Sequence, residues 1–428
     1  GGKKEMSAVL KRKVFFIRIQ LLSPLNVSSG EDEWTDADVL RDGKGNPFVA
    51  GTSLAGAMRA YLEKEKNSPC FMGYSGKNGI GKMSSLFISD LNFEEKVNLG
   101  VRDGVALNEE KVSITGSKYD LEILEAEATG SFYMELVIRD GDNEEEMDNE
   151  ISTLFQGIQN GEVRLGSKKT RGFGRFKLTS LSVWNYEKAN YLEYADAYSE
   201  DLRDKGKNEL DEWLAKASCE NKMIHIEVPL RMKGGISIRQ YSAKKNEPDF
   251  VQLTDHGKPV IPGSSFAGAI RHRMDTILRE LEIPEAGTMI QTAFGYTEKE
   301  ESCASNIIIS EAEITEAKEL TMVRTGISRF ESAAKEHSLY KEKTYVDGKL
   351  KLELAVRKGK PDTKWMLGFL LLALKDLQNG FLAVGGQTAI GRGVFEPDGP
   401  ILIDGKKEDA LFIQEAFKSL EDAKGGNR

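Results

Sequence analysis

Two stretches of this chain have almost the same sequence: VAGTSLAGAMR at residues 49–59 and IPGSSFAGAIR at residues 261–271. About a hundred residues after each stretch comes a glycine-rich run, GFGR at residues 172–175 and GRG at residues 391–393. A frame that occurs twice with its glycines in matched places indicates an internal repeat. The sequence therefore predicts two copies of one fold, in which a site in one copy has a counterpart position in the other.

The segments around this frame follow one order in both halves. Apolar and polar residues alternate before the frame at residues 17–21 and 224–230, and again after it at residues 132–138 and 350–356, as in half-buried strands. Each half also has an expected helix and short strand between these segments, and a second helix and last strand after them. The order strand, helix, strand, strand, helix, strand predicts an α+β fold class with two tandem ferredoxin-like domains.

The first expected helix of each half begins with small and hydroxyl residues. Ser53 and Ser265 are expected to cap these helices, because a hydroxyl can accept from the unpaired amides of a first turn. Gly56 and Gly268 predict a thin helix face that packs closely against a sheet.

At 428 residues, the chain is too long for one ordinary core and suits two domains. The repeat places a first domain at residues 1–185 and a second at residues 222–400. Residues 186–221 are expected to form a helical linker, and residues 401–428 a C-terminal helix and tail.

The composition is that of a globular protein, with 39% apolar and 30% charged residues. The formal net charge of −9 argues against indiscriminate nucleic-acid binding but permits a local basic groove. No apolar run is long enough to span a bilayer, and we expect no signal peptide before the first strand. The three cysteines and four histidines are scattered and lack the spacing of metal ligands, and the scattered cysteines favour a cytoplasmic protein. No Ser-His-Asp or Cys-His set occurs, so we expect no catalysis of that kind.

The glycine-rich run of the first half is strongly basic. Residues 163–175 hold five cations, of which Lys168, Lys169, Arg171 and Arg175 are candidate RNA-binding residues. Glycines let a backbone approach phosphates and expose its amides, and the cations attract the phosphates. The matched run keeps the glycines with the single cation Arg392. The alternative is a flexible hairpin that binds nothing.

The helix starts are candidate anion sites, because the first amides of a helix have no partner within it. Ser53, Ser264 and Ser265 lie there, and Arg59 and Arg271 follow about two turns later. The alternatives are ordinary capping for the serines and pairing with a carboxylate for the arginines.

Two pairs of aspartates, each with a spacing of six, precede the helices: Asp36 with Asp42, and Asp249 with Asp255. A carboxylate beside an RNA phosphate can hold a divalent cation or take a proton from a 2′-hydroxyl. Loop carboxylates that are simply solvated are the alternative. In the first half Asp38 competes with Asp36 for this role.

This set of motifs resembles the RAMP superfamily of CRISPR-associated proteins, over about residues 13–180 and 222–397. The resemblance is carried by PGSSF at residues 262–266 with Arg271, by the two glycine-rich runs, and by the Val-Arg-x-Gly sequences at residues 101–104 and 323–326. It is greatest to the backbone subunit of type III effector complexes, here as two fused copies of the kind found in III-D-like systems.

The resemblance implies that the chain binds guide CRISPR RNA, target RNA and other effector subunits, and that it is not a membrane protein. It implies thumb hairpins at about residues 101–132 and 324–350, which would distort the guide–target duplex, and it adds Arg324 and Arg329 to the RNA-binding residues. It also implies that Asp36 and Asp249 cut the target RNA with Mg²⁺ or another divalent metal.

We therefore expect an endoribonuclease subunit that cuts guide-paired RNA at two places. The alternative from another class is a non-catalytic scaffold that only organises the guide RNA and neighbouring subunits. A repeat-cleaving guide-maturation enzyme is disfavoured, because no suitable histidine lies near the first strand. The first copy has Ala-Gly-Thr at residues 50–52 where the second has Pro-Gly-Ser, so activity at only one site stays open.

Overall fold

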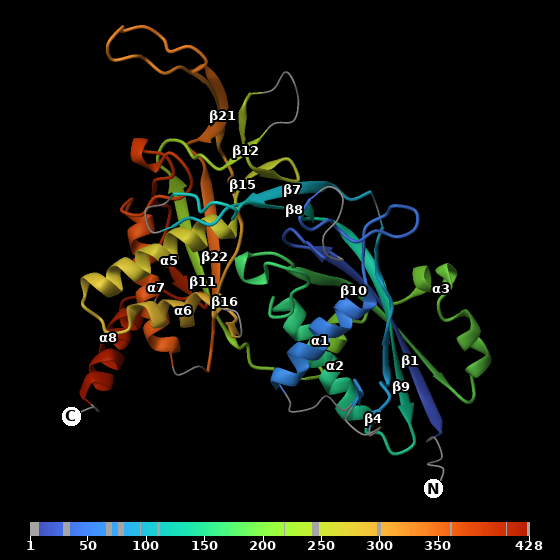
Figure 1. The fold of residues 1–428 in the computed structure, drawn as a ribbon. Helices are drawn as coiled ribbons and strands as arrows, with labels where there is room; N and C mark the ends of the chain where they lie inside the picture. The colour runs from blue at the N-terminus through green and yellow to red at the C-terminus, as the bar shows by residue number, and fades with distance from the viewer. Residues whose placement is uncertain are drawn as a thin grey trace. The chain divides into compact units, whose positions relative to one another are not determined.

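The structure is a computed structural model. It describes residues 8–28, 35–65, 71–75, 81–94, 96–108, 112–217, 219–241, 248–297, 301–359, 362–407 and 409–425. The chain forms two compact units (Figure 1). The first comprises Gly1–Gly104, Tyr119–Lys169 and Phe173–Asn221, and the second comprises Val105–Lys118, Thr170–Gly172 and Lys222–Arg428. None of the described helices is long and apolar enough to span a bilayer.

The main sheet of the first unit is antiparallel. Its strands, in order across the sheet, are β10 (Phe176–Glu187), β1 (Val9–Leu21), β9 (Thr129–Arg139), β6 (Leu91–Phe93) and β2 (Phe48–Val49), with β5 (Leu86–Ile88) also paired to β9. The central strand β1 places Ile17 opposite Leu181 on one side and Phe132 on the other. The four main strands therefore stand in the order fourth, first, third, second, which is the ferredoxin-like order that the sequence predicted.

The second unit repeats this sheet. Its strands, in order, are β18 (Ile307–Ile309), β22 (Lys349–Arg357), β11 (Met223–Met232) and β23 (Phe395–Pro397), and β24 (Leu402–Ile403) also pairs with β11. The central strand is again the first of the unit along the chain. The prediction of two tandem α+β domains is thus confirmed.

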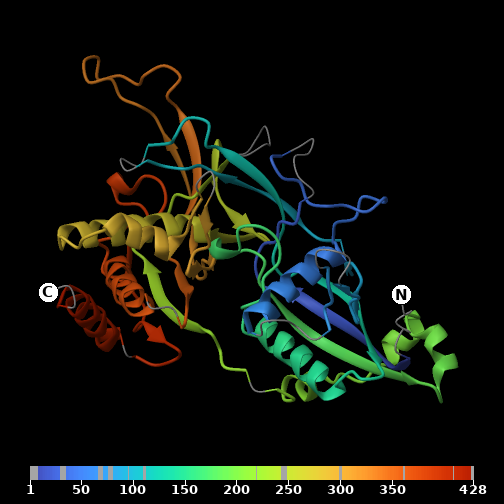
Figure 2. The ribbon, with the colours of Figure 1, turned by 60° about the horizontal axis from the view of Figure 1, so that its bottom comes forward.

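Two long helices cover one face of each sheet. In the first unit these are α1 (Gly51–Glu65) and α2 (Glu144–Gln159), and in the second they are α5 (Gly263–Glu280) and α7 (Thr363–Gln378). Figure 2 shows α5 and α7 side by side on their sheet. Both α2 and α7 are followed by a glycine with positive φ, Gly161 at 72° and Gly380 at 78°. Glycine ends these helices because it adopts the left-handed conformation without a Cβ clash.

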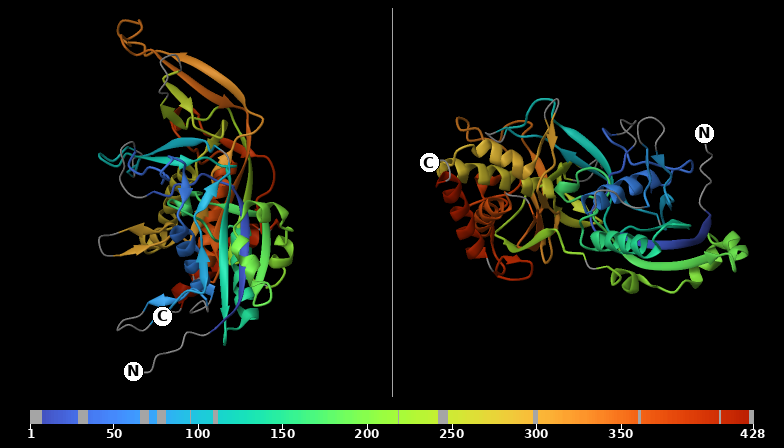
Figure 3. Two further views of the ribbon diagram at one scale, coloured as in Figure 1. Left: turned by 90° about the vertical axis from the view of Figure 1, so that its right-hand side faces the viewer. Right: turned by 90° about the horizontal axis from the view of Figure 1, so that it is seen from below.

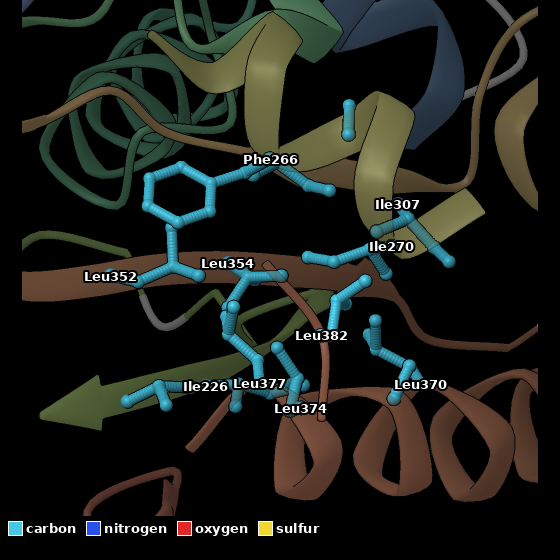
Figure 4. Close-up of a cluster of buried hydrophobic side chains, with 14 of the residues drawn as sticks. Ile226, Phe266, Ile270, Ile307, Leu352, Leu354, Leu370, Leu374, Leu377 and Leu382 are labelled. Atoms are coloured by element: carbon cyan, nitrogen blue, oxygen red, sulfur yellow. The ribbon is translucent and has the colours of Figure 1, made fainter. Parts of the chain in front are cut away.

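The cores form where the apolar side of each central strand meets the helices. In β1 every second residue from Phe15 to Leu21 has at most 1% of its surface exposed. Figure 4 shows the second core, where Phe266 and Ile270 of α5 point toward Leu352 and Leu354 of β22. Each such fully buried side chain contributes about 1.5–3 kcal/mol of transfer free energy. The alternation read from the sequence therefore identifies the face of each strand that holds its unit together.

The first helix of each unit starts differently from the prediction. Gly51 and Gly263 are the first helical residues, so the serines lie inside the first turn instead of capping it. The cap of α5 is Pro262, without a side-chain hydrogen bond, and the Gly51 amide donates to Asp90 Oδ1 at 2.7 Å. Glycine is required at this start, because a Cβ would lie 2.6 Å from Ile88 O in one unit and 2.3 Å from Ile309 O in the other. The prediction of serine caps was wrong.

The prediction that Gly56 and Gly268 pack against a sheet was also wrong. Both residues are exposed, and a Cβ built on either one meets no atom within 4 Å. The sheet-facing side of α5 is formed instead by large apolar residues such as Phe266, Ile270 and Met274.

The segments outside the repeat pack onto the units. Residues 186–221 hold a 3₁₀-helix (η3, Tyr191–Asp196) and two short α-helices, α3 (Glu200–Lys205) and α4 (Leu210–Leu214). Trp213 of α4 is 3% exposed and belongs to the first core. The C-terminal helix α8 (Asp409–Gly425), red in Figure 3, packs on α7. At their contact Gly368 leaves room for the side chain of Ala416.

Candidate functional site

The glycine-rich loops at residues 163–175 and 382–394 are anchored by the same backbone hydrogen bonds in both units. The amides of Leu165 and Val384 each donate across the loop at 2.9 Å, to Gly174 O and Gly393 O. Two further bonds tie each loop to the segment after the central strand. They are Ser167 N to Asn26 O and Gly174 N to Pro24 O in the first unit, and Gly386 N to Ser237 O and Gly393 N to Gly235 O in the second, all at 2.8–2.9 Å. The backbone of each loop is therefore held at the same points in both units.

Glycine is needed at the C-terminal end of each loop. Gly174 and Gly393 have φ of 73° and 69°, and a Cβ there would lie 1.9 Å and 1.8 Å from the facing carbonyl oxygens of Leu165 and Val384. Several backbone amides of these loops already donate hydrogen bonds within the protein. The expectation that the glycines expose the loop amides to phosphates therefore does not hold for these amides. Any attraction of these loops for RNA therefore comes mainly from their side chains.

The first loop presents its lysines outward. Lys168 and Lys169 are exposed, and Lys168 Nζ lies 4.3 Å from the centre of the Tyr119 ring. Arg171 and Arg175 are half-buried. Arg164 is only 8% exposed and donates from Nε to Gly161 O at 3.1 Å, so it supports the loop from inside.

In the second loop Gln387 stands where the first has Lys168, and both residues have the same left-handed backbone, with φ of 57° and 50°. Arg392 contacts Met322 Sδ from Nη2 at 3.2 Å, and Arg324 reaches the same sulfur at 3.5 Å. Two of the predicted RNA-binding arginines, which are far apart in the sequence, therefore lie on either side of one methionine.

The two candidate catalytic aspartates occupy equivalent places. Asp36 Oδ2 accepts from the backbone N–H of Asp120 at 2.9 Å, and Asp249 Oδ2 accepts from the backbone N–H of Lys341 at 2.8 Å. Both aspartates are exposed. Asp36 also donates its own amide to Asp120 Oδ1 at 3.1 Å, so two carboxylates stand side by side in the first unit. In the second unit a lysine replaces one of them.

The structure shows that Asp36 and its neighbour Asp38 have different environments. Asp38 is 3% exposed and accepts from Thr35 Oγ1 at 2.6 Å, which makes it a structural residue of the loop. Asp36 is therefore the carboxylate that solvent or a ligand can reach.

The second aspartate of each pair belongs to a turn. Asp42 accepts from the amides of Asn46 and Lys44, both at 2.8 Å, and these hydrogen bonds, with that of Asn46 the largest, lower the pKa of Asp42. Asp255 is 5% exposed and precedes the tight turn between β14 (Thr254–Asp255) and β15 (Lys258–Ile261). The two aspartates of each pair are six residues apart in both units because the second aspartate belongs to a turn that precedes the helix.

A buried asparagine that the sequence did not single out joins the parts of the first site. Asn26 is 1% exposed and donates from Nδ2 to Ala37 O at 3.0 Å and to Glu122 O at 2.8 Å. Its Oδ1 accepts from Ser167 Oγ at 2.8 Å. Asn26 thereby connects the aspartate loop, the strand that holds Asp120 and the glycine-rich loop.

In the second unit Ser237 and Gln252 together make the corresponding connections between loop and strands. Ser237 Oγ donates to Glu342 Oε1 at 3.3 Å, and Gln252 accepts from Ile238 N at 3.2 Å and donates to Val260 O at 2.9 Å. Asn26 and Ser237 occupy matched positions shortly after the central strands, which end at Leu21 and Met232, and this match is the sequence signal that could have found them.

The match to known families covers both copies of this arrangement. The model of the RAMP superfamily matches residues 18–177 and again residues 224–396, which is most of the chain. This chain belongs to the RAMP superfamily. Proteins of this superfamily bind RNA and work in CRISPR-associated complexes. No curated protein matches the chain significantly.

Each RAMP domain carries a hairpin where the resemblance placed a thumb. The first consists of β7 (Leu99–Gly104) and β8 (Tyr119–Leu124), and the second of β20 (Lys318–Arg324) and β21 (Tyr340–Val346). The second hairpin projects from its unit in Figures 1 and 3. Its tip exposes apolar side chains, with Phe330 fully exposed and Ile327 68% exposed. The aspartates lie where the paired strands of these hairpins meet the connecting loops, because Asp120 and Lys341 are the second residues of β8 and β21.

The candidate RNA-binding residues on the first helix of each RAMP domain have different surroundings in the two domains. Arg59 donates from Nη1 to Gly73 O at 3.0 Å and from Nη2 to Met72 O, so its guanidinium already holds backbone carbonyls. Arg271 has neither a hydrogen bond nor an ion pair with any residue that the structure describes. Ser264 is exposed, whereas Ser53 and Ser265 are half-buried. Arg329 lies exposed near the tip of the second hairpin.

Proposed function

We propose that this RAMP protein is a guide-RNA-binding backbone subunit of a type III CRISPR effector complex that cuts guide-paired target RNA at two sites. The supporting observation is the duplicated position of Asp36 and Asp249. Each is an exposed carboxylate held by an amide of a hairpin's returning strand. A scaffold that only binds RNA would have no need to fix an accessible carboxylate at the same place twice.

The residues around the two aspartates fit a divalent cation to different degrees. Asp36 and Asp120 offer two carboxylates, whereas Asp249 stands alone beside Lys341. Among the described residues no group of three or more His, Cys, Asp and Glu side chains could hold a metal ion. Mg²⁺ keeps several waters and is bound through one or two carboxylates together with substrate phosphates, so Asp36 with Asp120 offers ligands of the kind it uses.

A divalent cation bound at such a place stabilises negative charge on a phosphodiester. The protein itself would supply the remaining parts of the reaction. An ionised Asp36 or Asp249 can accept the proton of a ribose 2′-hydroxyl within hydrogen-bonding reach. Lys168 and Lys169 in the first unit, and Arg324 and Arg392 in the second, would hold the phosphates of the strand.

The test uses the assembled complex, with a target strand of defined sequence labelled at one end. Asp36→Ala and Asp249→Ala are made singly and together, and product lengths are measured in Mg²⁺. Each single variant should lose one product, and the double variant should lose both. Normal cutting by the double variant would show that these residues are not catalytic.

A non-catalytic scaffold is the second candidate, favoured by the pairing of Asp249 with a lysine where Asp36 has a second carboxylate. The wild-type complex distinguishes the two functions. Cutting with Mg²⁺ that stops with chelator supports the nuclease, whereas intact target under both conditions supports the scaffold.

A further inference from the structure

Asp249 stands directly before a strand that pairs with the second hairpin. This strand is β13 (Phe250–Gln252), and it lies between β12 (Arg239–Tyr241) and β21 in a sheet of the order β12-β13-β21-β20. The hydrogen bond from Lys341 N to Asp249 Oδ2 joins β21 to the residue before β13. The place of the Asp249 carboxylate is therefore set by how β13 lies against the hairpin.

Phe250, the residue after Asp249, is held by side chains of both neighbouring strands. The guanidinium carbon of Arg239 in β12 lies 4.4 Å from the centre of the Phe250 ring. Tyr340 in β21 meets the same ring edge to face, with the ring centres 6.1 Å apart. Tyr340 directly precedes Lys341, whose amide binds Asp249. The contacts of Phe250 therefore hold the backbone on both sides of this hydrogen bond.

A buried carboxylate anchors Arg239. Glu342 is 2% exposed, and its Oε1 lies 3.6 Å from Arg239 Nε. The same oxygen accepts from Ser237 Oγ at 3.3 Å, and Glu342 is the ladder partner of Phe250 in β21. A buried charge is costly unless an opposite charge accompanies it. Glu342 therefore keeps the guanidinium of Arg239 in place over the Phe250 ring.

This cluster is internal packing, because Arg239 lies directly on Phe250 and the carboxylate of Glu342 is buried. Asp249 itself is exposed. The cluster therefore supports the strand next to the candidate catalytic group and leaves the group itself accessible.

The first RAMP domain supports its aspartate in another way. Ala37 and Ser28 stand where the second domain has Phe250 and Arg239, so the stack of a guanidinium on a ring cannot form there. Instead, Asn26 Nδ2 donates to Ala37 O at 3.0 Å. The supports of the two aspartates are thus different residues, and each can be removed without changing the other.

We infer that Arg239 is a positioning residue for Asp249. Held by Glu342, its guanidinium fixes the Phe250 ring and with it the strand that follows the carboxylate. This inference rests on the proposed cleavage of target RNA and adds a residue that the reaction needs at one site only. A displacement of about 1 Å can slow a reaction by about 100-fold, so loss of this support should be measurable in one product.

The test uses the assembled complex in excess over an end-labelled target strand, and it measures the rate at which each product forms. The second site is the one whose product is lost in Asp249→Ala. In Arg239→Ala the maximal rate at this site should fall by about 100-fold, while the rate at the first site stays at the wild-type value. The concentration of complex that gives half the maximal rate should not change, because Arg239 supports the aspartate and does not hold the RNA. Arg279→Ala, which removes an exposed arginine of α5 paired with Asp275, is the control and should leave both rates unchanged.

Arg239→Lys separates positioning from compensation of charge. Lysine keeps a positive charge beside Glu342 but has no flat group to lie on Phe250. Its melting temperature should therefore match that of the wild type, while the second site is still cut about tenfold more slowly.

Each outcome decides a separate question. Wild-type cutting at the second site by both Arg239 variants, or equal slowing at both sites, would overturn the inference and leave the proposed nuclease intact. Full activity of Arg239→Lys beside a slow Arg239→Ala would show that only the charge beside Glu342 matters, which also overturns a role through Phe250. A higher half-maximal concentration with an unchanged maximal rate would assign Arg239 to RNA binding instead. A wild-type complex that cuts nothing would remove the proposed function and this inference together.

Discussion

Asp249 accepts a hydrogen bond from the backbone amide of Lys341 at 2.8 Å, and the first RAMP domain repeats this bond between Asp36 and Asp120. Lys341 is the second residue of the returning strand of the second hairpin, so this hydrogen bond ties the Asp249 carboxylate to the hairpin itself. A duplex that engages the hairpin can therefore set the position of the candidate catalytic group.

The first prediction separates the charge of Asp249 from its hydrogen bond. In Asp249→Asn the amide oxygen can still accept from Lys341 N, so the melting temperature should stay at the wild-type value. Cutting at the second site should fall by about 100-fold or more, because the proton acceptor is lost. Single-turnover cleavage and thermal unfolding measure the two effects. Full cutting by the asparagine variant would contradict a catalytic carboxylate.

The second prediction concerns the unequal neighbours of the two aspartates. Lys341→Asp gives Asp249 a second carboxylate, and Asp120→Lys removes one from Asp36. A unit charge at about 4 Å in water is worth about 1 kcal/mol, or about fivefold in binding. Half-maximal Mg²⁺ for cutting should therefore fall at the second site in Lys341→Asp and rise at the first site in Asp120→Lys. Identical Mg²⁺ curves for these variants and the wild type would exclude a metal bound beside the two aspartates.

The third prediction tests the closure of the second glycine-rich loop. Gly393→Ala should destabilise the protein by about 3 kcal/mol, because φ is 69° and a Cβ would lie 1.8 Å from Val384 O. Gly268→Ala in the same unit is the matched control. That position is helical, exposed and open, so alanine should stabilise it by about 1 kcal/mol. Urea denaturation measures both, and equal effects would contradict the described loop.

The fourth prediction concerns Asn26. Asn26→Ala leaves Ala37 O, Glu122 O and Ser167 Oγ without their partner and should cost about 3 kcal/mol. Under conditions in which the variant stays folded, cutting should weaken at the first site and persist at the second, because Asn26 orders only the first aspartate loop. Equal loss at both sites would point to general misfolding.

The fifth prediction concerns the tip of the second hairpin. Phe330 is fully exposed, so Phe330→Ala should change the free energy of unfolding by no more than about 0.5 kcal/mol. If the hairpin engages the duplex, cutting at the second site should slow. Phe381→Ala, at a 77% exposed position after α7, serves as the comparison and should cut normally. Equal cutting by both variants would remove the tip from the mechanism.

Much of the fold followed from local signals in the sequence. The alternation around Ile17 and Ile226 gave the central strands, and the duplicated frame gave two domains. These signals work because side-chain period and chain order are local properties. The serines at the helix starts misled us, since the residue that begins each helix is fixed by contact of Gly51 and Gly263 with distant carbonyls.

The candidate site was less accessible to sequence reasoning. Matching the two halves picked out Asp36 and Asp249, but it could not show that Asp38 is buried or that Asp42 closes a turn. Asn26 and Glu342 escaped notice because their importance lies in which distant groups surround them. A buried polar group is defined by tertiary packing, which a single sequence does not display.

The two glycine-rich loops keep one backbone course while carrying different side chains, with Lys168 and Gln387 in the same left-handed conformation. The backbone conformation of the loop is thus the same whether lysine or glutamine occupies this position. Substituting the lysines of the first loop into the second would therefore raise its affinity for a polyanion while the backbone of the loop stays the same. Gene duplication followed by such local substitutions leaves one chain with two loops of the same backbone course and different charge.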